Sequence, residues 1–313
     1  MRKQFVWAAA ALFGVVGASA PAAAQQLEIM TSLPSLGFPF FVHMQDELSA
    51  EAAMLGDITI VATDGQNSTP KQAADVEAAI VQGVDGIVIS PKDAVAMAPA
   101  LQEAVDAGIP VVTIDRRVEG VPGILGHVGA DNVKGGEAQG AFIKALFPDG
   151  ARVMNLQGQP GSSPAIDRNA GVHNVLDGDD RYVFIFEDTA QFAREEAVRV
   201  TEAALAGLNE PPDVIVAAND DMALGALTVL EEKALDIPVI GFDALPEALK
   251  SIRDGKLTAT VEQFPGGQSS GALKTLVEFL RNGVKPAQQV TLLTPIIITK
   301  DNIEDAERLG EVQ

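Results

Sequence analysis

Short apolar runs rich in β-branched residues alternate with amphipathic segments from residue 27 onwards. The runs have the length of strands buried on both faces, and the segments between them repeat apolar residues with the period of a helix. Strands separated by helices are typical of βαβ units, so an α/β fold with parallel sheets is expected. The predicted strands are Leu27–Met30, Ile58–Ala62, Gly86–Ile89, Val111–Ile114, Arg152–Leu156, Tyr182–Phe186, Val214–Ala217, Val239–Phe242 and Thr258–Val261. The predicted helices are Phe41–Leu55, Thr69–Gln82, Ala94–Ala107, Val133–Phe147, Glu195–Leu208, Met222–Ala234 and Ser269–Asn282.

The number of units favours two sheets over one. The chain has 313 residues, whereas single cores stop growing near about 250–300 residues. No Pro/Gly/Ser-rich linker divides the chain, which indicates that it crosses between two domains more than once. We place the crossings near Ala130, Gln263 and Leu293. One domain would then hold residues 25–130 and 264–293, and the other 131–263 and 294–313.

Residues 1–24 have the pattern of a cleaved secretory signal. Arg2 and Lys3 precede an apolar run from Phe5 to Val16, and the alanines at 22–24 fit a small-residue cleavage site before Gln25. The alternative is an uncleaved membrane anchor, but the run is shorter than the roughly 20 apolar residues that a spanning helix needs. We therefore expect a soluble protein in a bacterial periplasm.

Composition narrows the classes of function. Hydrophobic residues make up 47% of the chain and charged residues 21%, as in a globular protein. The formal net charge of −21 argues against a nucleic-acid partner, because such a surface repels phosphate backbones. The chain has no cysteine, which excludes disulfides, thiolate metal sites, cysteine nucleophiles and lipid attachment on cysteine.

Polar residues follow the carboxyl ends of several predicted strands, where ligands bind in parallel α/β sheets. An aromatic cluster lies near the end of the first strand, an arginine follows the strand at 152–156, and a phenylalanine follows the strand at 182–186. The candidate binding residues are Phe38, Phe40, Phe41, Asp115, Arg116, Arg168, Phe192, Asn219, Asp243 and Gln263.

These residue types suit a sugar. Aromatic rings pack on the apolar C–H faces of a polyhydroxylated ring, while carboxylates, guanidinium groups and amides bind its hydroxyls. Each residue also has a structural alternative: Asn219 could be only a helix N-cap, and Phe40 and Phe41 could belong to the core. By themselves, these patterns indicate a polar small-molecule site between two α/β domains.

Patterns for other chemistry are absent or incomplete. His43, His127 and His173 lack metal-ligand spacing, and residues 177–180 lack the remaining ligands of a calcium loop. No phosphate-binding glycine loop is present. Asp115 and Asp243 could serve a glycosidase, but the amides and arginines around them favour holding hydroxyls over cleaving a bond. We therefore expect no catalytic residue, no metal site and no cofactor.

Six segments together resemble the periplasmic substrate-binding proteins of sugar ABC importers, of the ribose, galactose and inositol type with the type I fold. The resemblance covers essentially all of the chain after the signal. The segments are Pro39–Val42, Thr113–Arg116, Gly129–Asn132, Asn219–Ala226, Gly241–Asp243 and Ala259–Gln263.

The resemblance implies two Rossmann-like lobes joined by a three-strand hinge, with the sugar in the cleft. It implies that Phe40, Phe41 and Phe192 are aromatic plates and that Asp115, Arg116, Arg168, Asn219, Asp243 and Gln263 bind hydroxyls. Arg168 and Phe192 rest mostly on this resemblance. Ribose binders have an asparagine at the position of Phe38, so the first-lobe wall here is more apolar. The segments 158–163, 240–249 and 298–312 look most like the myo-inositol-binding branch.

The expected function is hinge-closing capture of a monosaccharide or cyclitol and its delivery to an ABC transporter permease, with myo-inositol or a pyranose as leading ligand. The chain is expected to act as a monomer. Alternatives are a pentose or a linear polyol as ligand, and a sugar receptor that feeds chemotaxis or signalling. A secreted glycoside-active enzyme is more remote. A sugar-responsive transcription factor would need a DNA-binding segment where the signal lies.

Overall fold

The computed structural model of the chain describes residues 26–312. The predicted signal segment at 1–24 and the cleavage site before Gln25 lie outside these residues, so both stay predictions. Within the described range, no helix combines the length and the apolar character needed to cross a bilayer.

The first lobe is built on a six-stranded parallel sheet with the strand order β11-β5-β4-β3-β1-β2. Its register places Leu27 of β1 opposite Ile58 of β2. The strands are β1 Leu27–Leu33, β2 Ile58–Asp64, β3 Gly86–Ile89, β4 Val111–Ile114, β5 Gly126–Ala130 and β11 Val290–Leu293.

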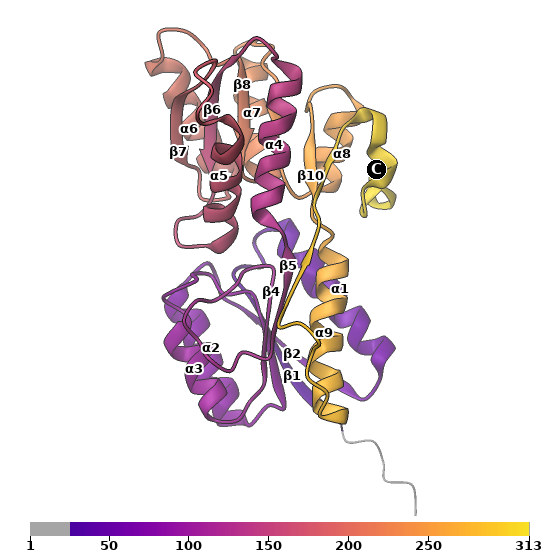
Figure 1. Cartoon of the computed structure of the whole chain (residues 1–313). Helices are drawn as coiled ribbons and strands as arrows, with labels where there is room; N and C mark the ends of the chain where they lie inside the picture. The colour runs from indigo at the N-terminus through magenta and orange to yellow at the C-terminus, as the bar shows by residue number, and fades with distance from the viewer. Residues whose placement is uncertain (1–25, 313) are drawn as a thin grey trace, which may run out of the picture.

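Helices cover both faces of this sheet (Figure 1). Neighbouring residues of β1 show why: Met30 packs in a buried cluster with the helices on one face, while Ile29 packs in the cluster on the other face. This alternation along a fully buried strand explains its continuous apolar run. One face carries α2 Thr69–Gln82 and α3 Ala98–Asp106, and the other carries α1 Pro39–Leu55 and α9 Pro265–Asn282.

The second lobe repeats this design with a four-stranded parallel sheet in the order β7-β6-β8-β9. Val153 of β6 packs in the cluster that contains residues of α4 and α5, and Met154 packs in the cluster that contains residues of α6 and α7. The strands are β6 Ala151–Gln157, β7 Tyr182–Thr189, β8 Val214–Ala217 and β9 Val239–Ile240. The helices are α4 Asn132–Leu146, α5 Ser163–Leu176, α6 Arg194–Gly207 and α7 Asp220–Glu232.

The C-terminal tail lies beside the second lobe (Figure 1). Strand β12 pairs antiparallel with β10, with Ile298 opposite Thr260. Ile298 is buried with Leu249 and Ala306, which attaches the tail to α8. These elements are β10 Thr260–Glu262, β12 Ile296–Ile298, α8 Pro246–Arg253 and the short 3-10 helices η1 Lys300–Asp305 and η2 Leu309–Glu311.

Three segments connect the two sheets: the passage from β5 to α4, from β10 to α9, and from β11 to β12. They run side by side in the middle of the molecule (Figure 1). We keep as a proposal the division into residues 25–130 plus 264–293 and residues 131–263 plus 294–313.

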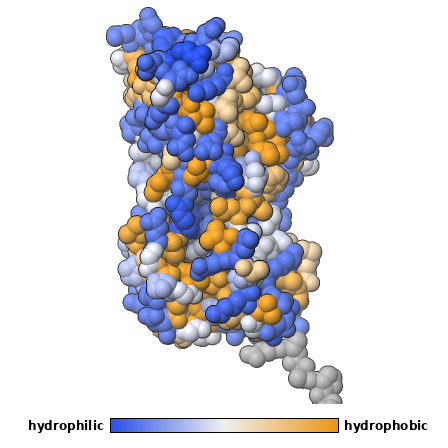
Figure 2. Space-filling model, viewed as in Figure 1, coloured by the Kyte–Doolittle hydropathy of each residue, from blue (hydrophilic) through white to orange (hydrophobic). Residues whose placement is uncertain are grey.

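The predicted α/β fold of two lobes with parallel sheets is confirmed, and every predicted strand and helix has a counterpart. The antiparallel pairing of β10 with β12 was not expected. Two α-helices and three strands were also missed: α5, α8, β5, β11 and β12. Hydrophilic residues cover much of the outer face, with apolar residues scattered among them (Figure 2).

Candidate ligand-binding site

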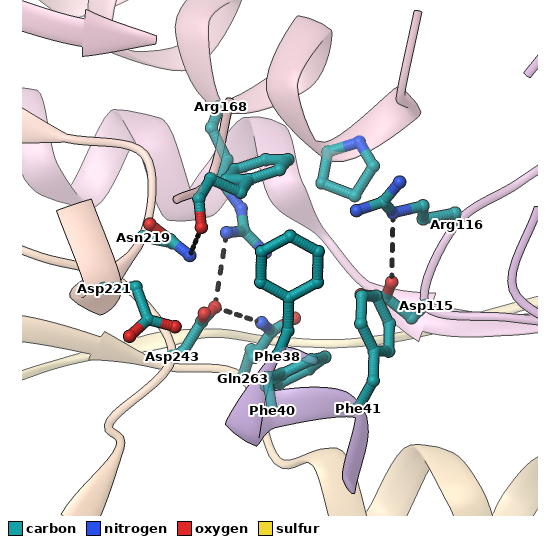
Figure 3. A pocket seen from close by; sticks show the side chains of 12 residues that line it. Phe38, Phe40, Phe41, Asp115, Arg116, Arg168, Asn219, Asp221, Asp243 and Gln263 are labelled. Atoms are coloured by element: carbon teal, nitrogen blue, oxygen red, sulfur yellow. Dashed lines mark hydrogen bonds and ion pairs between the residues drawn. The ribbon is translucent and has the colours of Figure 1, made fainter. Parts of the chain in front are cut away.

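The structure brings all ten sequence-predicted residues around one cavity between the lobes (Figure 3). The cavity is narrow, with a free volume of about 30 Å³. Two further residues, Pro164 and Asp221, complete the lining.

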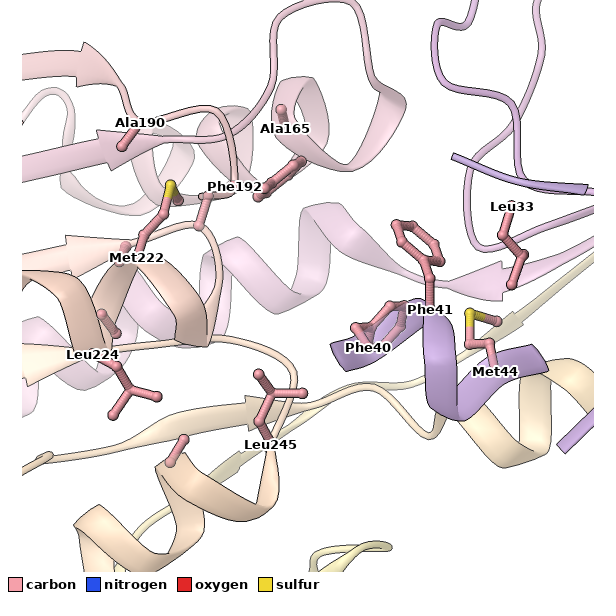
Figure 4. Close-up of a cluster of buried hydrophobic side chains, with 14 of the residues drawn as sticks. Leu33, Phe40, Phe41, Met44, Ala165, Ala190, Phe192, Met222, Leu224 and Leu245 are labelled. Carbon is pink, nitrogen blue, oxygen red and sulfur yellow. The ribbon is translucent and has the colours of Figure 1, made fainter. Parts of the chain in front are cut away.

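The first wall is a set of three phenyl rings at the start of α1. Pro39 occupies the first turn of this helix, where its missing N–H removes no hydrogen bond. Phe38 and Phe40 each meet the Phe41 ring edge to face, with ring centroids 6.4 and 5.3 Å away. Phe40 and Phe41 are also part of the buried core that continues across the cleft to Phe192 (Figure 4). Phe40 and Phe41 therefore pack in the core and line the cavity at the same time.

Asp115 and Arg116 come directly after β4, at the carboxyl end of the first sheet. Asp115 has a positive φ of 59°, and one of its carboxylate oxygens accepts a hydrogen bond from the Ser90 hydroxyl at 3.1 Å. Burial raises the pKa of Asp115, although the neighbouring guanidinium groups of Arg116 and Arg168 act in the opposite direction. A buried carboxylate with a spare oxygen is a strong acceptor for a ligand hydroxyl.

Arg116 is held between two aromatic rings, with its guanidinium carbon 5.3 Å from the Phe41 centroid and 5.6 Å from the Phe192 centroid. Its Nη1 donates to the Gln159 amide oxygen at 3.0 Å and to a backbone carbonyl. Its Nε has no hydrogen-bond partner among residues 26–312, although it lies 3.8 Å from an Asp115 oxygen. Burial lowers the pKa of Arg116 to about 10, so the group stays charged at neutral pH.

Asn219 is both a helix N-cap and a residue of the cavity wall, the two roles that its sequence position allowed. Its side-chain oxygen accepts from the Met222 N–H at 3.0 Å and so caps α7. Its amide nitrogen donates to the Phe192 carbonyl at 3.2 Å, which ties the loop carrying that ring to the helix start. The cap therefore fixes Asn219 at the cavity without removing it from the lining.

Arg168, Asp243 and Gln263 form a connected group on the opposite side of the cavity (Figure 3). One Asp243 carboxylate oxygen accepts from Gln263 at 2.5 Å and from Arg168 at 3.3 Å. Arg168 also donates to the Asn132 side chain at 2.8 Å and lies 3.6 Å above the Phe242 ring. Burial raises the pKa of Asp243 to about 7, against the opposing effect of Arg168.

The charges around the cavity are matched. Asp115 lies beside Arg116, Asp243 beside Arg168, and Asp221 3.1 Å from Arg194. A charged ligand would leave one of these buried groups without its counterion, which costs several kcal/mol per ion. The cavity therefore suits a neutral ligand with many hydroxyl groups and apolar ring faces.

Pro164 and Asp221 were not among the predicted site residues. Asp221 directly follows Asn219 and Asp220 in the sequence, so its place after β8 was a usable signal. Pro164 lies in the first turn of α5, a helix that the sequence patterns did not predict. Its position became apparent only from the fold.

A second and larger cavity of about 490 Å³ lies next to the hinge. Asp115 is the only residue of the predicted set that lines it, and no phenyl ring does. His127 at its wall contacts the Thr113 hydroxyl oxygen at 2.9 Å, and burial lowers the His127 pKa to about 4. No group of acidic and histidine side chains among residues 26–312 is arranged to hold a metal ion.

Comparison with known proteins agrees with this geometry. A family model described as a periplasmic binding protein domain matches residues 29–283. The ribose import binding protein of Bacillus subtilis is 41% identical over 244 residues, which are 77% of this chain and 77% of that protein. A crystal structure of the Caulobacter myo-inositol binding protein bound to myo-inositol is 41% identical, with a TM-score of 0.88, over 92% of this chain and 98% of that one. An ABC transporter solute binding protein from Bacillus halodurans with bound myo-inositol is 30% identical, with a TM-score of 0.85, over 91% of this chain and 98% of that one.

Proposed function

Because the chain belongs to the periplasmic binding protein family, whose domain model matches residues 29–283, we propose that it captures a neutral cyclitol or monosaccharide in the periplasm. It delivers this ligand to the permease of an ABC transporter. The observation that carries the proposal is the single cavity that combines four phenyl rings with two matched Asp–Arg pairs. In this proposal the chain acts as a monomer and performs no catalysis.

Myo-inositol or a pyranose is the leading ligand. Phe38 supports this choice, because it lines the cavity at a position where the resemblance to ribose binders implies a polar asparagine. A more apolar first wall favours a six-membered ring, whose chair exposes extended C–H faces, over a smaller furanose ring. The structures bound to myo-inositol that resemble this chain point in the same direction. Ribose remains the competing ligand, since the 41% identical Bacillus subtilis relative is a ribose import binding protein.

Closure explains how such a site would gain both affinity and selectivity. A ligand that contacts Asp115 on one lobe and Asp243 on the other favours the closed form by its difference in affinity for the two forms. Closure removes water, so a ligand that lacks one hydroxyl leaves a buried partner unpaired. A micromolar dissociation constant corresponds to a binding free energy of about −8 kcal/mol, which the contacts made on closure would have to supply.

The proposal is tested by a thermal-shift panel of cyclitols, monosaccharides and linear polyols. A ligand at 100 times its dissociation constant adds about 2.7 kcal/mol to the free energy of unfolding, so the midpoint shifts rank the ligands directly. Myo-inositol or a pyranose is expected to give the largest shift. If ribose or a linear polyol ranks first, the leading ligand is wrong, and if no member shifts the midpoint, the proposed function is wrong.

Asp115→Ala provides the site control for this panel. The variant is expected to lose the ligand-dependent shift and to keep a cooperative unfolding transition, because the Asp115 side chain faces the cavity. The exposed Asp236→Ala serves as the matched variant and should retain the full shift. An undiminished shift in Asp115→Ala would contradict the site assignment.

A further inference from the structure

Two fully buried residues behind the cavity, Asp220 and Thr260, hold the turn that carries Asp243. Neither of them lines the cavity itself. Asp220 is the first residue of α7, directly after Asn219, and Thr260 begins β10. Asp220 therefore adjoins Asn219 of the proposed site, and Thr260 lies three residues before Gln263. Neither side chain is placed to contact a ligand in the cavity.

Every side-chain oxygen of this pair takes part in holding the turn. The Thr260 hydroxyl donates to one Asp220 carboxylate oxygen at 2.7 Å, and it accepts from the Ala244 N–H at 3.2 Å. The other Asp220 oxygen accepts from the Leu245 N–H at 2.8 Å. Two successive N–H groups after Asp243 are thus bound by one carboxylate and one hydroxyl.

The turn needs this support because its backbone is strained. Asp243 has a φ of 112° and Ala244 a φ of 49°. Such conformations cost on the order of 1–3 kcal/mol for a residue with a side chain and persist only where the surroundings determine them. Gly241 completes the arrangement, since a Cβ at that position would overlap the Asp220 carboxylate.

We infer that Asp220 and Thr260 are positioning residues for the proposed site. They hold the turn 243–245 so that the Asp243 carboxylate points into the cavity toward Gln263 and Arg168. This inference rests on the proposed function for its effect on affinity. Since Thr260 lies on β10, which leads into one of the three connections between the lobes, the pair also ties the orientation of Asp243 to the hinge.

The test is a double-mutant cycle on the dissociation constant of the best ligand from the panel, with myo-inositol as the first probe. Thr260→Val keeps the shape of the side chain and removes its hydroxyl, so about tenfold weaker binding is expected. Thr260→Ser restores the hydroxyl and should bind within about threefold of the wild type. In an Asp243→Ala background, Thr260→Val should make no further difference, because its effect passes through the Asp243 carboxylate.

An equal loss of affinity with and without Asp243 would overturn the inference, as would unchanged binding by Thr260→Val. If Thr260→Val does not fold, Asp220→Asn takes its place. The side-chain NH₂ of the asparagine would then face either the Thr260 hydroxyl or the Leu245 N–H, which are both donors, so one of the two hydrogen bonds would be lost.

Amide hydrogen exchange of the ligand-free protein supplies a readout that does not depend on the proposed function. The amides of Ala244 and Leu245 should exchange faster in Thr260→Val than in the wild type, while amides in the first lobe should not change. Unchanged exchange at both positions would overturn the positioning role even if a ligand binds. Conversely, faster exchange in a protein that binds no member of the panel would contradict the proposed function and leave the positioning role standing.

Discussion

Three cavity residues project from backbone that ordinary side chains avoid. Asp115, Phe192 and Asp243 all have φ between 58° and 112°. Strained backbone concentrates at functional sites because the surrounding structure must determine it. Sequence patterns placed Asp115 and Asp243 after strands but did not predict this conformation, since neither residue is a glycine.

The residues that the sequence did locate share a simple physical origin. Asp115 and Asp243 follow apolar runs, and in parallel sheets the carboxyl ends of such runs meet at one edge. Arg168 lies within α5, which no pattern predicted, so its prediction rested mostly on the resemblance. Pro164 was missed for the same reason. Side-chain placement on an unpredicted helix needs the packing of the whole lobe.

The raised pKa of Asp243 predicts how the ligand-free protein responds to pH. Burial raises the pKa of this carboxyl from 3.8 to about 7 in the folded protein. Between these values the folded state holds a proton that the unfolded state has lost, so the free energy of unfolding falls as pH rises from about 4 to about 7. The contribution of Asp243 to this decline is up to about 4 kcal/mol.

Urea unfolding of the ligand-free protein between these pH values measures the effect. Asp243→Asn should flatten the decline, because the amide does not titrate, while the exposed Asp236→Asn should decline as the wild type does. Other groups such as Glu307, whose pKa burial raises to about 7, contribute equally to all three proteins. A decline in Asp243→Asn as steep as in the wild type would refute the assignment to Asp243.

At the scale of elements, the close approach of α4 and α5 places Arg168. A Cβ on Gly136 of α4 would overlap the carbonyl oxygen of Arg168, and a Cβ on Gly171 of α5 would overlap the carbonyl oxygen of Val133. Glycine at both positions therefore lets the two backbones touch. The contact brings Arg168 within reach of Asn132, at the point where the chain enters the second lobe.

Gly136→Ala is expected to push α5 away from α4. Overpacking of this kind costs about 1–3 kcal/mol in the free energy of unfolding, and ligand affinity should fall because the Arg168 guanidinium shifts relative to Asp243. Gly207→Ala at the end of α6 is the matched control, since no heavy atom lies within 4 Å of its Cβ position. Chemical denaturation and titration calorimetry check both effects, and equal stability and affinity in the two variants would contradict this role of Gly136.

Two of the elements that sequence patterns missed lack the local hydrophobic pattern of a strand or a helix. Strand β5 reads Gly-His-Val-Gly-Ala, which lacks the β-branched run of its neighbours, although all five residues are buried in the structure. Helix α5 includes Pro164, Arg168 and Gly171 among its buried residues, so its inner face does not show an apolar period. In both cases tertiary packing overrides local propensity.

At the scale of the whole molecule, contacts between the lobes cross the cleft on several sides of the cavity. Arg117 forms a two-pronged ion pair with Asp167. The Gln159 amide donates to the Asn67 side chain at 2.7 Å, and the Ala94 N–H donates to the Gly161 carbonyl at 2.9 Å. The Arg117–Asp167 and Gln159–Asn67 contacts are partly buried, and a hydrogen bond of this kind contributes about 0.5–1.5 kcal/mol. We propose that these contacts align the closed form and that a bound ligand supplies the remaining free energy of closure.

Small-angle X-ray scattering with and without saturating ligand tests closure around one neutral polyol most directly. The ligand is the first-ranked member of the thermal-shift panel, and the ligand-free Asp115→Ala variant serves as the open reference. We predict a smaller radius of gyration on saturation, with a scattering curve that matches the closed structure, in the wild type alone. A curve that stays unchanged when the ligand saturates the protein would contradict capture between the lobes.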